Sequence, residues 1–338
     1  MAKILPLGKL KYNLLEEFLQ KYRGIEDKRL IVGPKIGEDA AIISLPDRYL
    51  VAKSDPVTFA TDEIGWYAVN VNANDIAVRG ARPRWFQSTI LLPEEKTTKD
   101  LVEKVFSQIS LACKELKVAI VGGHTEVSHN LKQPIVVGCM FGEVKKERLI
   151  TTSGAKVGDD ILLTKGIVIE GTSILAREKE EELRQRGYSH DFIRRSKDYL
   201  HNPGISVVKD ALLANKYKVS SMHDPTEGGL ATGLYEIARA SQVGMLIYAQ
   251  KIPILPESKI LCQEFGLNPL GTITSGTLLL TTKTENSLKI LKTYKTKGIK
   301  ASLIGKVKDK TCGIKIEVDG KITNLKYSEK DEITKLWD

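Results

Sequence analysis

Acidic and amide side chains recur along this chain beside glycines and other small residues. They are Asp39 in GEDAA, Asp55 in KSDP, Asn74 and Asp75 in NANDIAVRGARP, Glu126 in GGHTEVS, and Asp224 and Glu227 in HDPTEGG. Carboxylate and amide oxygens are the hard ligands that suit Mg²⁺. Taken singly, Asp39 is better explained as a turn former and Asp55 as a strand terminator. Taken together, these residues predict a site for a divalent cation and its ligand.

Asp75 is the hardest of these residues to explain by structure alone. It is followed by Ile76, Ala77 and Val78 in an otherwise apolar stretch with helical character. A carboxylate buried there without a partner would lower stability by several kcal/mol. We therefore expect Asp75 either to face solvent or to meet a cation.

Two glycine pairs could supply the amide donors that phosphate oxygens need. Gly122–Gly123 directly follows a strand-like run, and Gly228–Gly229 begins a predicted helix whose N-terminal end favours anions. Each pair is also explained as a tight packing turn. Residues 271–277 have the glycine spacing of a P-loop but lack its lysine, and neither G-x-G-x-x-G nor a kinase H-R-D with D-F-G occurs. The carboxylates and glycines together predict a Mg-nucleotide site without a standard nucleotide loop.

Helical and extended patterns in both halves of the chain must position these residues. In the first half, apolar spacing predicts helices over 11–23, 63–79 and 98–116 and strands over 49–52, 84–92, 118–121 and 134–144. In the second half it predicts strands over 160–164, 244–249, 277–281, 301–307, 313–318 and 321–325, and helices near 171–178, 191–200, 204–214 and 228–240. Small and polar residues at 151–158 separate the halves. We expect two domains of α/β and α+β class, 1–153 and 154–338.

The composition is that of a folded globular protein. Of 338 residues, 42% are hydrophobic and 28% charged, which is close to the usual mixture. The longest apolar run, near 135–141, is far short of the roughly 20 residues that cross a bilayer, and the start of the chain is too brief for a signal peptide. We therefore expect a cytoplasmic protein without membrane contact. Its four cysteines are widely spaced, which predicts buried reduced thiols rather than zinc ligands or disulfides.

The net charge of +9 is concentrated in one segment. Residues 283–310 contain nine lysines against Glu285 and Asp309, so this segment alone contributes +7. A basic face attracts nucleic acid, but the segment has no arginine and its single aromatic residue is Tyr294, which disfavours base stacking. We expect a solvated surface rather than a nucleic-acid site.

In their order along the chain, the acidic motifs resemble those of one enzyme superfamily. Its members include aminoimidazole ribonucleotide (AIR) synthase, selenophosphate synthetase, thiamine-monophosphate kinase and the hydrogenase maturation factor HypE. The similar segments are GEDAAII, KSDP, NDIAVRGARP, VGGHTEVS and MHDPTEGGLATGL. The final segment most resembles HypE, whereas the region of NDIAVRGARP also resembles the kinase. The resemblance implies an AIR-synthase-like fold, with an N-terminal ATP-binding sheet domain that forms a homodimer and a C-terminal α+β domain.

The resemblance also implies that ATP and Mg²⁺ lie between the domains. The implied residues are Asp39, Asp55 and Asp75 for the metal, Asp55, Asp75 and His124 for catalysis, and Asp39, Asn74, Gly122, Gly123, Thr125, Glu126 and Asp224 for the nucleotide. His124 stands where most of these families place an acid, and its role as acid, base or phosphate donor is open. The implied chemistry is activation of an acceptor by its attack on the γ-phosphate of ATP, aided by positioning and charge neutralisation.

Departures from the family patterns narrow the expected function. HypE carries its substrate on a cysteine at its C-terminal end, whereas the final thiol here is Cys312 and the chain ends at Asp338. We therefore expect an acceptor separate from the chain's own tail. Selenophosphate synthetase uses an N-terminal cysteine, and the first here is Cys113, which argues against that activity. Three functions remain: a HypE-like ATP-dependent enzyme whose acceptor is a small molecule or a group on a protein partner in metallocofactor maturation, a thiamine-monophosphate kinase, and a non-catalytic nucleotide-binding accessory protein.

Overall fold

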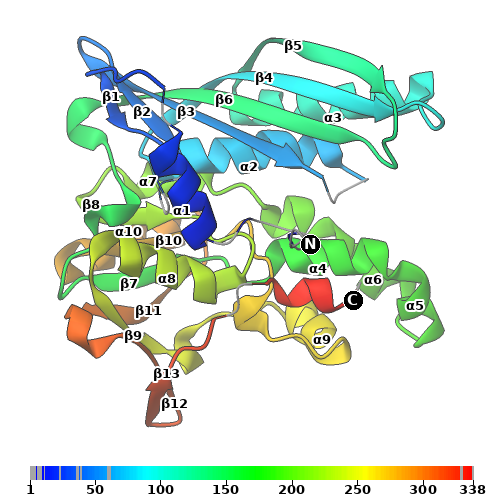
Figure 1. The fold of residues 1–338 in the computed structure, drawn as a ribbon. Coiled ribbons are helices and arrows are strands. Elements are labelled where there is room, and N and C mark those ends of the chain that lie inside the picture. Colours follow the sequence, from blue (N-terminus) through cyan, green and yellow to red (C-terminus); the bar gives the residue numbers. More distant parts are fainter. Residues whose placement is uncertain are drawn as a thin grey trace.

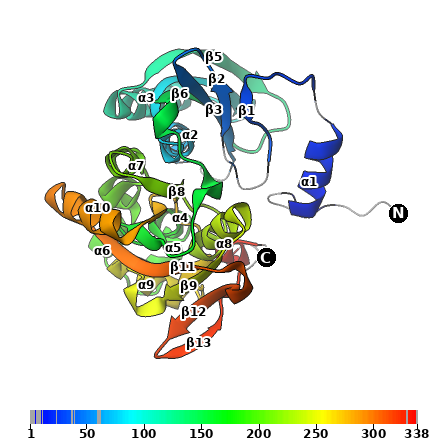
Figure 2. The ribbon, with the colours of Figure 1, turned by 90° about the vertical axis from the view of Figure 1, so that its left-hand side faces the viewer.

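Two β-sheets, one from each half of the chain, form the framework of the molecule (Figure 1). The computed structural model describes residues 5, 10, 12–22, 24–35, 38, 40–58, 62–327 and 330–336. Asp39 lies outside these residues. Figure 2 shows the first sheet and its helices lying above the second sheet, with α1 (Tyr12–Lys21) standing to one side.

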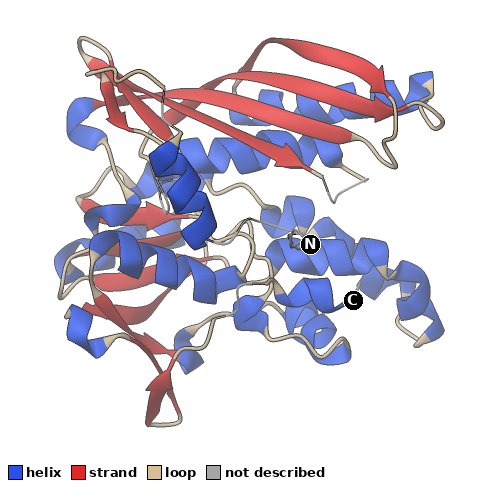
Figure 3. Ribbon diagram, viewed as in Figure 1, coloured by secondary structure: helices blue, strands red, loops and turns tan. Residues whose placement is uncertain are grey.

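The first sheet has six strands in the order β1-β2-β3-β6-β4-β5. Their bounds are Leu30–Val32, Ala41–Ser44, Arg48–Val57, Arg82–Pro93, Ala119–Ser128 and Ile135–Lys145 for β1 to β6. Neighbouring strands are antiparallel except for the parallel pair β4 and β5. Two helices, α2 (Ile64–Val78) and α3 (Lys99–Leu116), cover one face of this sheet (Figure 3).

Helix α2 is buried on nearly all sides because it lies between the first sheet and the second half of the chain. Thirteen of its fifteen residues are buried, so the helix is buried all round and has no solvent-facing polar side. It approaches β6 so closely that a side-chain carbon at Gly138 would lie 2.4 Å from Asn72 Nδ2. Ile76 of α2 and Leu162 and Leu280 of the second sheet belong to one continuous core. Polar residues of α2 are therefore held firmly at the junction of the two halves.

The second sheet has seven strands in the order β13-β12-β9-β11-β7-β10-β8. The bounds of β7 to β13 are Asp160–Thr164, Val219–His223, Gly244–Tyr248, Leu279–Thr282, Ala301–Lys308, Ile314–Val318 and Lys321–Asn324. Neighbouring strands are antiparallel, apart from the parallel pair β9 and β12.

Helices surround this second sheet. From α4 to α10 they cover Ile169–Glu178, Glu180–Gln185, His190–Asp198, Val208–Ala214, Gly229–Ser241, Pro256–Glu264 and Thr284–Thr296. Short 3-10 helices cover Lys146–Arg148, Thr152–Gly154, Ala249–Lys251, Pro269–Gly271, Lys310–Cys312 and Glu332–Leu336, and a π turn covers Leu200–Gly204. Among the helices of the described residues, none combines the length and apolar character needed to span a bilayer.

The sequence-based fold class, two mixed domains of α/β and α+β type, is confirmed. The structure differs from the expected elements in three respects. Gly122 and Gly123 lie inside β5 rather than after a strand, residues 204–207 precede α7 rather than begin it, and β1, β2, α5, β8, α9 and α10 were not anticipated. The boundary between 153 and 154 stays a prediction. All four cysteines are free, with Cys113 and Cys262 buried and Cys139 and Cys312 half-buried.

Candidate active site

Two of the predicted carboxylates meet at a single ammonium group. Lys53 and Asp55 lie two residues apart on β3, so their side chains share one face of the sheet. Asp75 reaches the same point from α2. Lys53 Nζ lies 3.1 Å from Asp55 Oδ2 and 3.0 Å from Asp75 Oδ2. We expected Asp75 either to face solvent or to meet a cation, and it meets the ammonium group of Lys53.

The burial of this cluster differs from one carboxylate to the other. The side chain of Asp75 is 8% exposed and that of Lys53 is 14% exposed, whereas Asp55 is 37% exposed. The cluster is therefore buried on the α2 side and accessible on the Asp55 side. Two carboxylates and one ammonium carry a net charge of −1, which favours an additional or substituting cation at this point.

The residues present fit Mg²⁺ bound together with a phosphate. Mg²⁺ usually keeps several waters and binds proteins through one or two carboxylates plus substrate phosphates. The oxygens of Asp55 and Asp75 that contact Lys53 lie within about 6 Å of each other, because both lie near 3 Å from one nitrogen. Within the described ranges there is no group of three or more acids, histidines or cysteines arranged to hold a metal alone. The site therefore suits a shared metal-phosphate ligand better than an all-protein metal cage.

Asn72, which the sequence reasoning missed, fixes the backbone of Asp55. Its Oδ1 accepts from the Asp55 N–H at 2.9 Å, and its Nδ2 donates to the Asp55 carbonyl at 3.3 Å and to Ala68 O at 2.8 Å. The amide of a buried helix thereby takes the place of a strand neighbour for Asp55. This contact sets the position of the carboxylate relative to α2.

Asn74 joins α2 to the second domain. Its Nδ2 donates to Ile205 O at 2.8 Å, and its Oδ1 accepts from Val207 N at 2.8 Å. The same loop is anchored by Lys165, whose Nζ donates to Gly204 O at 3.0 Å and Ser206 O at 2.7 Å. Asn74 thus positions the helix that carries Asp75 against the second domain, and both polar ends of its amide are used in doing so.

The predicted phosphate-binding glycines lie far from Asp55 within one chain. Gly122 and Gly123 are paired with Gln87 and Ser88 of β4, with positive φ values of 148° and 151° that favour glycine. Ser88 pairs with Gly138, which also pairs with Asp55. Three strand spacings of roughly 4.8 Å place Gly123 about 14 Å from Asp55. The structure therefore does not bring the glycines next to the carboxylate pair.

The polar residues of β5 form a separate exposed group. His124, Thr125 and Glu126 are all exposed on this edge strand. Glu126 Oε2 lies 3.1 Å from His124 Nε2, and Glu126 Oε1 accepts from Ser128 Oγ at 2.7 Å. The hydrogen bonds from Ser128 and His124 lower the pKa of Glu126. These side chains form a hydrogen-bonded set that faces solvent in a single chain.

Asp224 lies in the second domain, directly after β8. It is buried, and β8 is the edge strand that packs against α2. The neighbouring His223 Nε2 contacts Glu236 Oε2 at 2.6 Å. The helix N-terminus formed by Gly228–Gly229 already has an anion from its own chain, because Asp331 Oδ2 accepts from Gly228 N at 2.6 Å. Burial raises the pKa of Asp331 to about 6.

A buried ion pair was also missed by the sequence reasoning. Arg79, fully buried one turn after Asp75, contacts Glu38 Oε2 through Nη1 at 3.1 Å. The Thr152 N–H points to the same Glu38 oxygen at 3.5 Å. The sequence did offer a signal for this ion pair: Arg79 is a charged residue that follows the apolar residues after Asp75. This pair links the GEDAA segment, α2 and the connection between the domains.

Two family models match these two domains. The N-terminal domain of AIR synthase related protein matches residues 37–144, and the C-terminal domain of the same family matches residues 156–317. Both models fall on the sheets described above. The fold and the junction site thus define a two-domain protein of the AIR synthase type.

Full-length relatives agree with these models. A putative hydrogenase expression/formation protein of Methanocaldococcus jannaschii is 30% identical over 318 residues, which are 92% of this chain and 91% of that protein. Carbamoyl dehydratase HypE of Cupriavidus necator is 31% identical over 72% of this chain and 68% of its own length. Thiamine-monophosphate kinase of Aquifex aeolicus is 26% identical over 72% of this chain and 78% of its own length. The chain belongs to the AIR synthase related family.

Solved structures show the same fold. The hydrogenase maturation protein HypE in complex with ATP has a TM-score of 0.68 at 22% identity, and the match covers 94% of this chain and 91% of that chain. The AIR-synthase-like fold expected from the sequence is therefore confirmed, as is the resemblance to HypE-like hydrogenase maturation proteins.

Proposed function

We propose that this protein is an ATP- and Mg²⁺-dependent enzyme that uses the γ-phosphate of ATP to activate an acceptor. The observation that carries the proposal is the convergence of Asp55 and Asp75 on one cationic group at the junction of the domains. The family relationship supports it, because a HypE of the same fold has been solved in complex with ATP. Phosphoryl transfer depends mainly on positioning and charge neutralisation, which a rigid junction provides.

In this proposal Asp55, Asp75 and Asp39 hold Mg²⁺. The bound metal would supply positive charge to the phosphate oxygens. Lys53 keeps the two described carboxylates close together and balances part of their charge. Its ammonium is also suited to contact a phosphate directly, as a compact point charge. Asn74 assists by fixing α2, and Asp224 contributes from the second domain.

The β5 residues enter the proposal as phosphate-binding residues in a homodimer. In one chain Gly123 lies about 14 Å from Asp55, and β5 is an edge strand with half-exposed Ile120, Val121 and Val127. An exposed apolar edge strand is a template for pairing with another chain. We propose that the first sheet pairs with that of a second copy, and that Gly122, Gly123, Thr125 and Glu126 line the phosphates there, with His124 as a catalytic group.

The acceptor is proposed by class alone. Similarity to a hydrogenase expression/formation protein and to HypE favours a group carried by a partner protein in metallocofactor maturation. Similarity to thiamine-monophosphate kinase supports a second candidate, phosphorylation of thiamine monophosphate. A third candidate, a nucleotide-binding accessory protein, would bind ATP without turning it over.

The proposal is tested by nucleotide binding and turnover in matched variants. Calorimetric titration with AMPPCP should show Mg²⁺-dependent binding by the unmodified protein. Asp75→Asn should weaken that binding by at least about 30-fold, since it removes a charged ligand. Asp198→Asn, which changes an exposed aspartate at the end of α6, should leave it unchanged. Binding that is equal with and without Mg²⁺, or equal in Asp75→Asn, would contradict the proposal.

Product analysis separates the candidates. Thiamine diphosphate formed from thiamine monophosphate and ATP identifies the kinase, and its absence at saturating ATP removes that candidate. ADP release that requires a partner protein supports the maturation enzyme. Tight Mg-ATP binding without turnover across the tested acceptors supports the accessory protein.

A further inference from the structure

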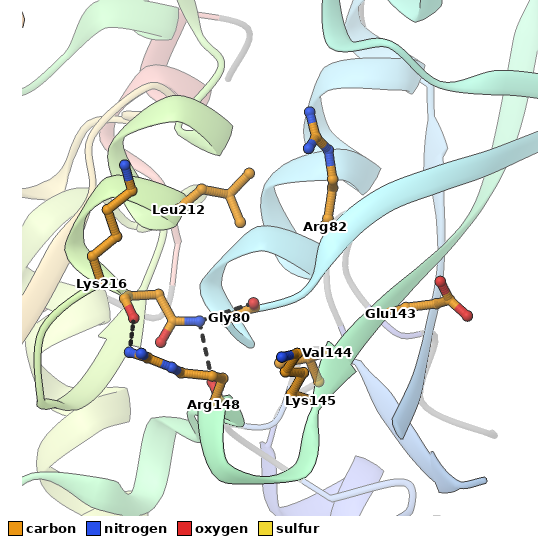
Figure 4. Close-up of a pocket in the computed structure, with 9 residues that line it drawn as sticks. Gly80, Arg82, Glu143, Val144, Lys145, Arg148, Leu212 and Lys216 are labelled. Atoms are coloured by element: carbon orange, nitrogen blue, oxygen red, sulfur yellow. Dashed lines mark hydrogen bonds between the residues drawn. The ribbon is translucent and has the colours of Figure 1, made fainter. Parts of the chain in front are cut away.

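A basic pocket lies between the two domains beside Gly80, just after the C-terminal end of α2 (Figure 4). The pocket has a volume of about 300 Å³. The first domain contributes Arg82, Lys145 and Arg148, and the second domain contributes Leu212, Asn215 and Lys216. In the strand register, Arg82 of β4 lies opposite Glu143 of β6 at one end of the sheet. Asp55 lies opposite Gly138, which is five residues from Glu143 along β6. The pocket is therefore distinct from the carboxylate cluster.

The charge of this pocket is strongly positive. Four cationic side chains line it, against the single carboxylate of Glu143. That carboxylate is turned away from Lys216 and Leu212 in Figure 4, and it is balanced by Arg48 at 3.3 Å and Arg84 at 3.7 Å. Over the described part of the chain, Arg82, Lys145 and Lys216 take part in no ion pair. Their charges are available to a ligand.

The floor of the pocket is fixed by hydrogen bonds across the domains. Asn215 Nδ2 donates to Gly80 O at 2.9 Å and to Arg148 O at 3.1 Å, and Arg148 Nη1 donates back to Asn215 O at 2.8 Å. Gly80 has a φ of 76°, and a side-chain carbon there would lie 2.4 Å from Arg148 O. The walls that carry the cations are therefore held in place before any ligand arrives, which favours binding.

We propose that this pocket binds a phosphate-bearing small molecule that bridges the two domains. Figure 4 shows Arg82 and Lys216 on either side of Leu212, so one anionic group can meet cations from both domains while an apolar part covers Leu212. Arginine and lysine are the side chains that bind phosphate most strongly. The small volume of the pocket fits a small molecule better than an extended acidic segment of a protein. A ligand here stabilises the domain junction that also fixes α2.

Pyrophosphate is a suitable probe, because it carries the proposed chemistry without a base or sugar. Calorimetric titration is done on the full chain in EDTA, so that the result does not depend on a metal at Asp55 and Asp75. The expected result is one saturable site, weakened about tenfold by Lys216→Ala and further by Arg82→Ala/Lys216→Ala. Both side chains are exposed, so these variants should fold, and circular dichroism checks this. Lys292→Ala on the exposed face of α10 is the matched control and should bind pyrophosphate normally.

Two results would overturn the proposal. Unchanged pyrophosphate binding in the double variant, or equal weakening in Lys292→Ala, would show diffuse charge attraction instead of a site. Hexaglutamate binding that is lost in Arg82→Ala/Lys216→Ala, in a protein that does not bind pyrophosphate, would show that the pocket receives an acidic protein segment. Because Asp75→Asn leaves the pocket intact, failure here and failure of the proposed function are distinguishable.

Discussion

Replacing Lys53 with methionine removes the charge at the centre of the candidate site while keeping a side chain of similar length. In the native protein, Lys53 Nζ lies near 3 Å from both Asp55 and Asp75. After the substitution, Asp75 keeps a buried carboxylate that has lost this cation. The substitution therefore tests whether the cluster is an electrostatic site that requires a cation.

The expected loss can be estimated from the burial of the two carboxylates. Removing one partner of a buried ion pair costs about 3–5 kcal/mol, and the Asp75 side chain is 8% exposed. Asp55 is 37% exposed, so its pair with Lys53 contributes about 0–1 kcal/mol after solvent screening. We expect Lys53→Met to lower the free energy of unfolding by about 3 kcal/mol in EDTA. Mg²⁺ at a hundredfold excess over its Kd should return about 2.7 kcal/mol.

Urea unfolding followed by circular dichroism, in EDTA and in Mg²⁺, measures these changes. Lys104→Met is the matched control, because Lys104 pairs with Asp62 at 2.7 Å but both side chains are about half exposed, and it should change stability by less than about 1 kcal/mol. Lys53→Met/Asp75→Asn should be more stable than Lys53→Met alone. Equal stability of Lys53→Met and the native protein in EDTA would refute the electrostatic reasoning. A loss that is reversed neither by Mg²⁺ nor by Mg²⁺ with AMPPCP would refute the metal assignment.

Three further predictions concern the junction that supports this site. Asn74→Ala should lower the free energy of unfolding by about 3 kcal/mol, because two buried backbone groups lose their partner; a urea titration showing less than about 1 kcal/mol would contradict its joining role. Burial raises the pKa of Glu170 to about 7. The contribution of its protonated carboxyl to the stability of the fold is therefore complete below about pH 4.5 and is lost as the pH rises through 7. Glu170→Gln should therefore be more stable than the native protein at pH 8, by up to about 3 kcal/mol, with little difference at pH 4.5; thermal unfolding at both pH values measures this, and an equal effect at both would contradict it. Gly80→Ala should destabilise by about 3 kcal/mol, through its positive φ and the contact with a carbonyl, whereas Gly187→Ala, with open space around it, should cost about 1 kcal/mol; equal melting temperatures for the two variants would contradict this.

Local sequence patterns predicted those helices and strands whose apolar residues recur at a regular spacing along the chain. The apolar run before Gly80 predicted a helix over 63–79, and the structure has Ile64–Val78. A carboxylate in that run predicted a choice between solvent and a cation, since no buried carboxylate is stable alone. The identity of the cation was not predictable, because Lys53 meets Asp75 through the packing of β3 against α2.

Glycines and lysines misled the same reasoning. Gly122–Gly123 suggested a turn, because glycine weakens strands, but the parallel pairing of β5 with β4 carries the strand through both residues. The lysines of residues 283–310 obscured α10, whose apolar side is formed by Ile290 and Tyr294. The roles of Asn72 and Asn74 depend on contacts with distant backbone, which no local pattern reports.

The most direct test of the central claim is a crystal structure of the full chain with Mg²⁺ and AMPPCP. The account predicts a metal ion within about 2.1 Å of carboxylate oxygens of Asp55 and Asp75, with the terminal phosphate of AMPPCP bound to the same ion. A metal and phosphate bound elsewhere, with Lys53 still paired to both carboxylates, would contradict it.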